Sequence, residues 1–547
     1  MSEELKADVC IVGAGPAGII LALELARRRP DQKVLLLEYG WPGMPPRNGL
    51  DDSIRIDNLV NHHGPYDCTN KGLGGTTATW GGRCVMYDRV DFIDRPVYGG
   101  ECTWDESFLR AVIPFMAETQ DYFECGGGGF RLEGKPSVRP IAEGFQKGEV
   151  TDEALERWSL PTRFGDRYRR EIPKQPNLTL VEGMEARQLG EPDGKGCVRE
   201  LVVRNSRTGA VVVVRAARFV LAAGGQETTR LLLRSPGVFR ARGGPPESLG
   251  RYYQCHVSGK IATVRFRGDP KKTDFFFGRD GGGTYFRRRF QLAEETILEK
   301  NLLNAAVWLD NPLYHNPAHG NGAMSFMYLA MVTPWLGARL APPALAKAFT
   351  QGRANAVGAH LWNVLTGLPG SLVKPAEIFV RRYCMPRKLP GIFLYNPRNE
   401  YALHFHAEQM PDQNNRMSLA QDGETLEIRY RLRNEDLESV LRTHEILDKW
   451  LRRCGCGELV YWYPEKERAE AIRQMSCDGI HQNGTTRISA TADRGVVDTD
   501  LKVWGTENLY VCSSSAFPTS GQANPTFFTG LCAVRLAHML AGKNAKN

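Results

Sequence analysis

The sequence predicts an α/β protein with a second, α+β domain, and three observations lead to this fold class. Residues 7–12 form a continuous apolar run that ends in a glycine-rich turn and leads into a helical pattern. Residues 178–214 alternate short β-rich runs with turn signals. Residues 253–480 are rich in aromatic side chains and carry no such glycine turn. A chain of 547 residues is longer than chains that usually fold around a single hydrophobic core, so we expect two intertwined domains.

The first element is predicted to be a strand, turn and helix, followed by a second strand that ends at Glu38. This is the Rossmann-like dinucleotide-binding pattern, in which each glycine has a separate task. Gly13 makes the tight turn, Gly15 allows a pyrophosphate to approach, and Gly18 lets the helix pack on the strand. Glu38 lies at the distance expected of a ribose-binding carboxylate. A glycine-rich turn without a ligand is the alternative, and the agreement of strand, helix and acid speaks against it.

The later elements are expected to return the chain to the same sheet. The β-meander of residues 178–214 leads into a strand at 219–223 and a helix at 228–233. A final helix is predicted from Pro525 to about Ala541. We therefore assign residues 1–100, 177–252 and 481–547 to the nucleotide-binding domain, 101–176 to a helical and loop part of the second domain, and 253–480 to its main part.

Composition narrows the class of protein. With 42% hydrophobic and 24% charged residues, the chain is typical of soluble globular proteins. Its net charge of +8 is small for the length, and the basic residues are interpreted as scattered along the chain in short runs, for example at 27–29 and 287–289. Both observations argue against a nucleic-acid partner. The N-terminal residues lack the pattern of a signal peptide, so a cytoplasmic location is expected.

One stretch, residues 323–338, is more apolar than the rest. It is interrupted by Pro334 and is shorter than the roughly 18 apolar residues that a spanning helix needs, so it is not expected to cross a bilayer. Together with residues 340–343 it could form an apolar surface or a lid. A peripheral membrane contact is kept as a minor alternative.

Four separated segments resemble the glucose-methanol-choline (GMC) oxidoreductases: residues 13–38, 72–82, 219–233 and 481–540. The last is the most specific, because His481-Gln-Asn-Gly-Thr-Thr-Arg487 is followed by Phe517-Pro-Thr-Ser-Gly-Gln-Ala-Asn524-Pro-Thr526 in the family's order. The match is thin between 253 and 400. Within this family, the sequence motifs most resemble those of pyranose oxidase-like members and of bacterial members that oxidise sugars or alcohols.

The resemblance implies an FAD-binding, Rossmann-like domain with a β-meander, and an α+β substrate domain built on an antiparallel sheet. Thr79 stands where the pyranose oxidase type carries a histidine joined to its flavin, so the FAD is expected to be non-covalent. The implied FAD-binding residues are Gly13, Gly15, Gly18, Glu38, Gly75, Thr76, Thr79, Trp80, Gly81, Ala223, Gly224, Ser514, Pro525 and Thr526. Replacing Glu38 is expected to weaken FAD binding and to leave the fold largely intact.

His481 and Asn524 are the predicted catalytic pair. Alcohol oxidation needs a group that takes the hydroxyl proton, and an unperturbed histidine is neutral and basic near pH 7. Asn524 would position the substrate oxygen through its amide. The competing interpretations are a hydrogen-bonded structural histidine and, for Asn524 before Pro525, a helix N-cap. Gln409 is a weaker candidate for substrate binding, and no metal site is predicted.

The predicted function is therefore oxidation of a CH–OH group of a sugar or sugar-like alcohol, such as a glycoside or aminoglycoside, with transfer of the hydride to flavin N5. The family also includes non-redox lyases and decarboxylases, and a non-catalytic FAD-binding protein is a third class. Dioxygen, a quinone or a protein partner would each serve as electron acceptor, because the flavin itself carries the redox step. The exact substrate, the acceptor and the oligomeric state stay open.

Overall fold

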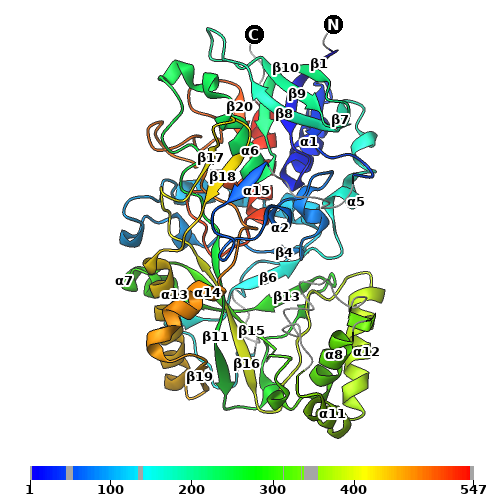
Figure 1. Ribbon diagram of the computed structural model, residues 1–547, viewed down its shortest axis with the longest axis vertical. Helices are drawn as coiled ribbons and strands as arrows, with labels where there is room; N and C mark the ends of the chain where they lie inside the picture. The colour runs from blue at the N-terminus through cyan, green and yellow to red at the C-terminus, as the bar shows by residue number, and fades with distance from the viewer. Residues whose placement is uncertain are drawn as a thin grey trace.

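The computed structural model describes residues 3–44, 53–132, 139–311, 313–333, 335–337 and 355–542. Figure 1 shows an elongated molecule with one sheet near the two chain ends and a second sheet toward the opposite end. The helices are α1 Pro16–Arg28, α2 Pro65–Cys68, α3 Glu106–Val112, α4 Met116–Phe123, α5 Phe164–Tyr168, α6 Gly224–Leu233, α7 Glu294–Lys300, α8 Gly322–Val332, α11 Val357–Thr366, α12 Gly370–Phe379, α13 Asn434–Arg453, α14 Arg468–Met475 and α15 Pro525–Gly542.

The first sheet contains seven strands and carries the predicted nucleotide-binding unit. Its parallel part consists of β7 (Leu178–Glu182), β2 (Val34–Glu38), β1 (Glu3–Val12), β10 (Val211–Leu221) and β20 (Leu509–Val511), and β9 (Glu200–Asn205) and β8 (Met184–Leu189) add an antiparallel meander. Strand β2 is buried along its whole length, as expected of a strand between parallel neighbours. The predicted fold class is confirmed.

Two details of this sheet differ from the sequence-based prediction. Residues 178–182 belong to the parallel sheet beside β2 and not to the meander. Residues 211–221 form one strand, where the sequence suggested a meander strand and a separate return strand. The reason is that β10 pairs with β1 over almost its whole length, while its first half also pairs with β9 and its last residues with β20.

The second sheet is antiparallel, as predicted for the second domain, and it contains six strands. Its order is β19 (Gly457–Tyr461), β11 (His256–Phe266), β16 (Glu400–Glu408), β15 (Ala305–Asp310), β14 (Phe290–Leu292) and β5 (Val150–Thr151). Helix α13 packs on this sheet through residues spaced three and four apart, including Leu437, Val440, Leu447 and Leu451. This packing holds the inner strands β11 and β16, which reach the candidate site.

Two smaller sheets join the halves of the molecule. One consists of β12 (Gly278–Arg279), β13 (Tyr285–Arg288), β6 (Leu155–Trp158) and β4 (Arg83–Cys84), and the other of β17 (Arg416–Leu419), β18 (Leu426–Arg429) and β3 (Ile54–Ile56). Helix α15 confirms the helix predicted from Pro525 and packs against α1, so the C-terminal segment lies beside the glycine turn.

The apolar stretch at 323–338 is only partly described. Its first part forms α8, on which α11 and α12 pack, and residues 338 and 340–343 lie outside the described residues. Within the described part of the chain, no helix combines the length and the apolar composition that a bilayer crossing requires.

Candidate active site

The glycine turn has the shape that a phosphate-binding turn needs. Gly13 has a φ of +100°, and a Cβ built on it would lie 2.6 Å from the Ala223 Cα. A Cβ on Gly18 would lie 1.9 Å from the Gly13 carbonyl oxygen, so helix α1 can approach the strand only with glycine there. Gly15, in contrast, has no atom within 4 Å of its built Cβ. The turn is therefore closed on the protein side and open in front of Gly15 and the start of α1.

Glu38 ties the surrounding loops together. Its buried carboxylate accepts hydrogen bonds from the backbone N–H groups of Ala14 (2.9 Å), Gly40 (3.0 Å) and Gly72 (2.7 Å). Burial raises the pKa of this carboxyl group despite the three donors. Since a carboxylate offers about four acceptor positions, one remains for a ribose hydroxyl. Glu38 thus has a structural task in addition to its predicted one.

The loop at 72–82 lies against the glycine turn. Gly75 opens a short 3₁₀ turn, and a Cβ on it would lie 3.2 Å from the Gly15 Cα. Trp80 is half-buried, and its indole N–H donates to the Thr162 carbonyl at 3.0 Å. Of the other predicted residues here, Thr76 is partly buried, whereas Thr79 and Gly81 are exposed. The loop is anchored through Trp80 and leaves its small residues accessible.

Ala223 and Gly224 begin α6 on the other side of the turn. Ala223 is partly buried, and Gly224 is exposed with a φ of +73° and has no atom within 4 Å of a built Cβ. Ser514 lies near the C-terminal end of β20, and its hydroxyl donates to the Gln482 carbonyl at 2.6 Å. This bond fixes the segment that follows His481.

His481 and Asn524 are brought together although 43 positions separate them. The Asn524 amide nitrogen lies 2.8 Å from the His481 Nε2. The Asn524 Oδ1 is buried and has no hydrogen-bond partner among the described residues, so the asparagine makes no side-chain N-cap bond to α15. Pro525 and Thr526 start α15 directly behind the pair, with Pro525 buried and Thr526 partly buried.

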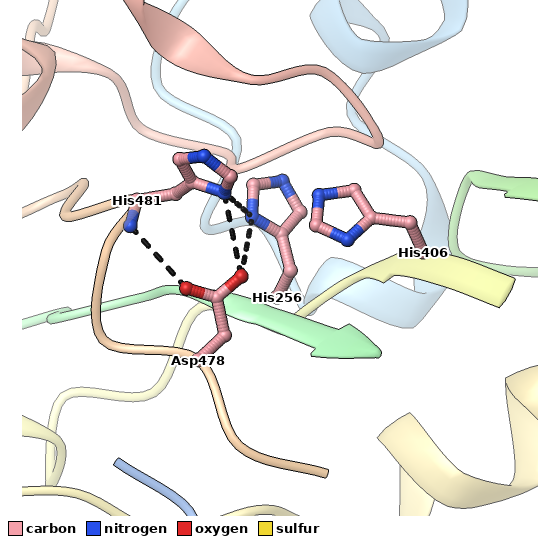
Figure 2. Close-up of side chains that lie close together, drawn as sticks. All are labelled: His256, His406, Asp478 and His481. Atoms are coloured by element: carbon pink, nitrogen blue, oxygen red, sulfur yellow. Dashed lines mark hydrogen bonds and ion pairs between the residues drawn. The ribbon is translucent and has the colours of Figure 1, made fainter. Parts of the chain in front are cut away.

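Asp478 is a third member that the sequence did not single out. Its Oδ2 lies 3.3 Å from the His481 Nδ1 (Figure 2). Its Oδ1 accepts from the backbone N–H of Ile480 at 2.9 Å. Burial opposes its ionisation, yet the adjacent imidazoles hold the pKa of Asp478 below its usual range. A proton on the His481 Nδ1 would face this carboxylate, which leaves Nε2 as the proton-accepting nitrogen.

Two further histidines reach the same place from the antiparallel sheet. The His256 Nδ1, on β11, lies 3.2 Å from the His481 Nδ1, and the His406 ring, on β16, stacks on His256 with centroids 4.1 Å apart (Figure 2). Burial lowers the pKa of His256 to about 3 and holds that of His406 well below its usual value, so both rings are neutral near pH 7. The Nε2 atoms of both are buried without a partner in the described chain.

These unpartnered atoms indicate a polar ligand. Buried polar groups normally have hydrogen-bond partners, and the Nε2 atoms of His256 and His406 and the Asn524 Oδ1 have none among the described residues around His481. Sequence reasoning missed both histidines because β11 and β16 are far apart in the chain and neither residue belongs to a motif. Asp478, three positions before His481, was the one member that local spacing could have suggested.

Gln409 uses both ends of its side chain within the protein. It is fully buried, its Oε1 accepts from the Cys255 N–H at 2.9 Å, and its Nε2 donates to the Arg431 carbonyl at 3.0 Å. Because both ends of the side chain are used within the protein, the geometry gives Gln409 the role of fastening β16 to its neighbours and speaks against the predicted substrate contact.

The same cluster also has the donor types of a metal site. His256, His406, Asp478 and His481 each offer one ligand atom, and these atoms lie within 4.8 Å of one another. A separate cavity of about 760 Å³ lies beside β5 and β14, lined by Arg289, Gln291 and Asn304 among others, and its lining includes none of the four. We place the candidate site at the histidines, since the reactive groups converge there.

Part of the chain matches a known protein family. Residues 411–533 match the family model described as GMC oxidoreductase. A curated relative, 6'''-hydroxyparomomycin C oxidase from Streptomyces lividus, is 25% identical over 46% of this chain, and the match spans 53% of the relative's own length. The chain thus covers about half of that protein.

Solved structures resemble the whole fold. Pyridoxine 4-oxidase from Mesorbium loti superposes with a TM-score of 0.55 at 18% identity, over 98% of this chain and 99% of the other. A fungal aryl-alcohol oxidase gives a TM-score of 0.51 at 15% identity, over 98% of each chain. At these identities the likeness establishes the fold alone.

Proposed function

We infer that this chain, a member of the GMC oxidoreductases, is an FAD-dependent oxidoreductase that oxidises a CH–OH group of a small molecule to a carbonyl. The observation that carries the proposal is the arrangement of His481 between Asn524 on one ring nitrogen and Asp478 on the other. This geometry suits a group that takes a proton at Nε2 while Nδ1 stays paired with a carboxylate.

The residues around the glycine turn fit FAD. The space in front of Gly15 and Gly224 is open, and a side chain at either position would project into it. Glu38 retains a position that can accept a further hydrogen bond. The diphosphate would lie at Gly13, Gly15 and the start of α1, and the loop at 75–81 would contact the flavin. When bound, FAD supplies an acceptor for the hydride of the alcohol carbon.

The chain's own groups would handle the proton. The substrate hydroxyl would donate to the His481 Nε2, and the Asn524 amide would hold the oxygen as charge develops on it. Asp478 would keep the imidazole in the tautomer with Nδ1–H and stabilise its charge after proton transfer. The neutral His256 and His406 would donate to or accept from further polar groups of the substrate.

We propose a sugar or sugar-like alcohol as the substrate class. The Nε2 atoms of His256 and His406 and the Asn524 Oδ1, which have no partner in the described chain, would suit a polyhydroxylated ring, which has hydroxyls on several neighbouring carbons. The partial similarity to an oxidase whose name contains an aminoglycoside supports this choice. Reoxidation of the reduced flavin with dioxygen, with quinones or with a protein partner would identify the electron acceptor.

A panel of alcohols mixed anaerobically with the purified protein tests the proposal. We expect loss of the oxidised flavin absorbance with sugar-type alcohols. Substrate turnover without flavin reduction would favour a non-redox lyase or decarboxylase, and the absence of any flavin change or turnover would favour a non-catalytic FAD-binding protein.

We predict that the FAD is held non-covalently. Thr79 is exposed and offers no imidazole for a bond to the flavin. Acid precipitation of the yellow holoprotein should therefore release the flavin into the supernatant, where its absorbance is measured. Flavin that stays with the precipitate would contradict this prediction.

Asp478→Asn is expected to slow flavin reduction by about tenfold or more, because the amide no longer enforces the Nδ1–H tautomer or balances the imidazolium charge. The pKa of Asp478 is depressed in the folded state, so its charge stabilises the fold above about pH 4 and this contribution is lost as the pH falls. The melting temperatures of variant and wild type should therefore differ at neutral pH and converge in acid.

Two results would argue against the role of Asp478. Equal reduction rates in Asp478→Asn and wild type would make the carboxylate a structural residue only. A stoichiometric divalent metal in the purified holoprotein, together with loss of activity on chelation, would assign the four-residue cluster to metal binding.

A further inference from the structure

Basic residues are concentrated in one segment of the chain. Residues 311–399 contain nine Lys and Arg side chains and a single acidic one, Glu377, so their formal charge of +8 equals that of the whole protein. The positive excess is therefore not scattered, as the short runs at 27–29 and 287–289 suggested. The remaining chain is electrically balanced, which makes 311–399 a distinct region.

The same segment exposes large apolar side chains. On α11, Trp362 is 67% exposed, Leu365 is 63% exposed and Leu361 is 50% exposed. Helix α12 and the turn after it continue this surface with Leu372, Val373, Phe379, Val380 and Tyr383. Single exposed apolar residues are common, but eight of them on two successive helices that pack on α8, and in the turn that follows, indicate an interaction surface. We call these residues of α11, α12 and the following turn the apolar face.

The apolar face lies at one end of the molecule. Helices α11 and α12 both pack on α8, which buries Met324 and Tyr328 beneath them, and the three helices project beside the antiparallel sheet, away from the end that carries both termini (Figure 1). Helix α8 covers the inner side of these two helices. Their outward side has no cover in the described chain.

Cations border the apolar face. Lys374 on α12 is exposed, Arg381 in the turn after it is partly buried, and both pair with Glu377. Two positive charges against one negative leave a positive rim, and Arg382 adds a further cation whose guanidinium also bonds to the Leu389 and Pro390 carbonyls. Large apolar and indole side chains next to lysine and arginine are the composition of helices that lie in a membrane interface.

We propose that the apolar face docks the protein on the surface of a bilayer containing anionic lipids. Trp362 and its leucine neighbours would enter the boundary between headgroups and acyl chains, and Lys374 and Arg381 would contact lipid phosphates. Charge complementarity selects lipid over a second copy of this chain, whose identical face would present the same positive charge.

Vesicle sedimentation with the full-length holoprotein tests the proposal. We expect binding to vesicles of equal phosphatidylcholine and phosphatidylglycerol, weak binding to pure phosphatidylcholine, and release as salt is raised. Trp362→Ser combined with Leu365→Ser should weaken the partition coefficient by more than about tenfold, since the exposed side chains lose their apolar burial. Lys374→Glu combined with Arg381→Glu should weaken it at least as much.

Matched controls separate a local effect from misfolding. Val211→Ser removes an exposed apolar side chain from the first sheet, and Arg240→Glu reverses an exposed arginine that, like Arg381, is paired with one glutamate. Both should bind vesicles as the wild type does. All variants should keep their FAD content and reduction rate with a soluble alcohol, because none of these residues belongs to the candidate site.

Three outcomes would overturn the proposal. The first is failure of the wild type to bind either kind of vesicle at about 0.1 M salt. The second is unchanged binding by both double variants. The third is a dimer in sedimentation velocity runs that Trp362→Ser with Leu365→Ser dissociates, which would assign the apolar face to self-association.

Discussion

His481→Ala should slow reduction of the flavin by the alcohol by about a hundredfold or more, the usual scale for loss of a positioned general base. The variant removes the group that lies between Asn524 and Asp478, and no other side chain in the described site is paired in this way. The loss should be greatest at low pH, where spontaneous ionisation of the alcohol helps least. Anaerobic stopped-flow absorbance measures the rate.

The control for this variant is His538→Ala, which removes a partly exposed histidine from α15 that pairs with Glu118. It should reduce at the wild-type rate. Reoxidation of reduced flavin should change little in either variant, because the acceptor step needs no base at the alcohol. If His481→Ala reduced as fast as wild type, His481 would have only a structural role.

Glu38→Ala is expected both to abolish stable FAD binding and to destabilise the apoprotein by about 3 kcal/mol or more. Two buried backbone N–H groups and one partly buried one would lose their acceptor, and each unsatisfied buried donor costs about 1–3 kcal/mol. The sequence alone suggested that the fold would stay largely intact. The structure predicts a larger effect, measurable by urea denaturation of flavin-free protein and by flavin content after purification.

Glu182→Ala provides the comparison, because Glu182 ends the neighbouring strand β7 in register with Glu38 but pairs with the exposed Arg169. Surface ion pairs contribute about 0–1 kcal/mol, so this variant should unfold nearly as wild type does. Equal stability of the Glu38 and Glu182 variants would show that the Glu38 hydrogen bonds contribute little.

Local patterns made much of the fold predictable. The first strand, turn and helix and the helix from Pro525 have strong local signals, namely an apolar run, glycines at fixed spacing and a proline at the first helical position. The single long strand β10 was not predictable in this way. Its extent depends on pairing with β1, β9 and β20, which are contributed by three separate parts of the chain.

In the candidate site too, the residues that belong to a local motif were predictable from the sequence and the others were not. His481 and Asn524 lie in a segment whose motif names them, and the structure places them in contact. His256 and His406 come from strands of the second sheet, where an isolated histidine in an aromatic-rich sequence looks like any buried residue. Gln409 illustrates the reverse case, since a plausible polar residue proved to be bonded at both ends to backbone groups.

This division of the site between two sheets has an evolutionary consequence. The proton-accepting pair belongs to the tail that packs on the first sheet, whereas His256 and His406 belong to β11 and β16. Mutations on those two strands can alter which molecule is selected while the pair next to the glycine turn stays in place. Directed evolution toward a new alcohol should therefore accumulate its changes on the facing positions of β11, β15 and β16, and spare the segment from Asp478 to His481.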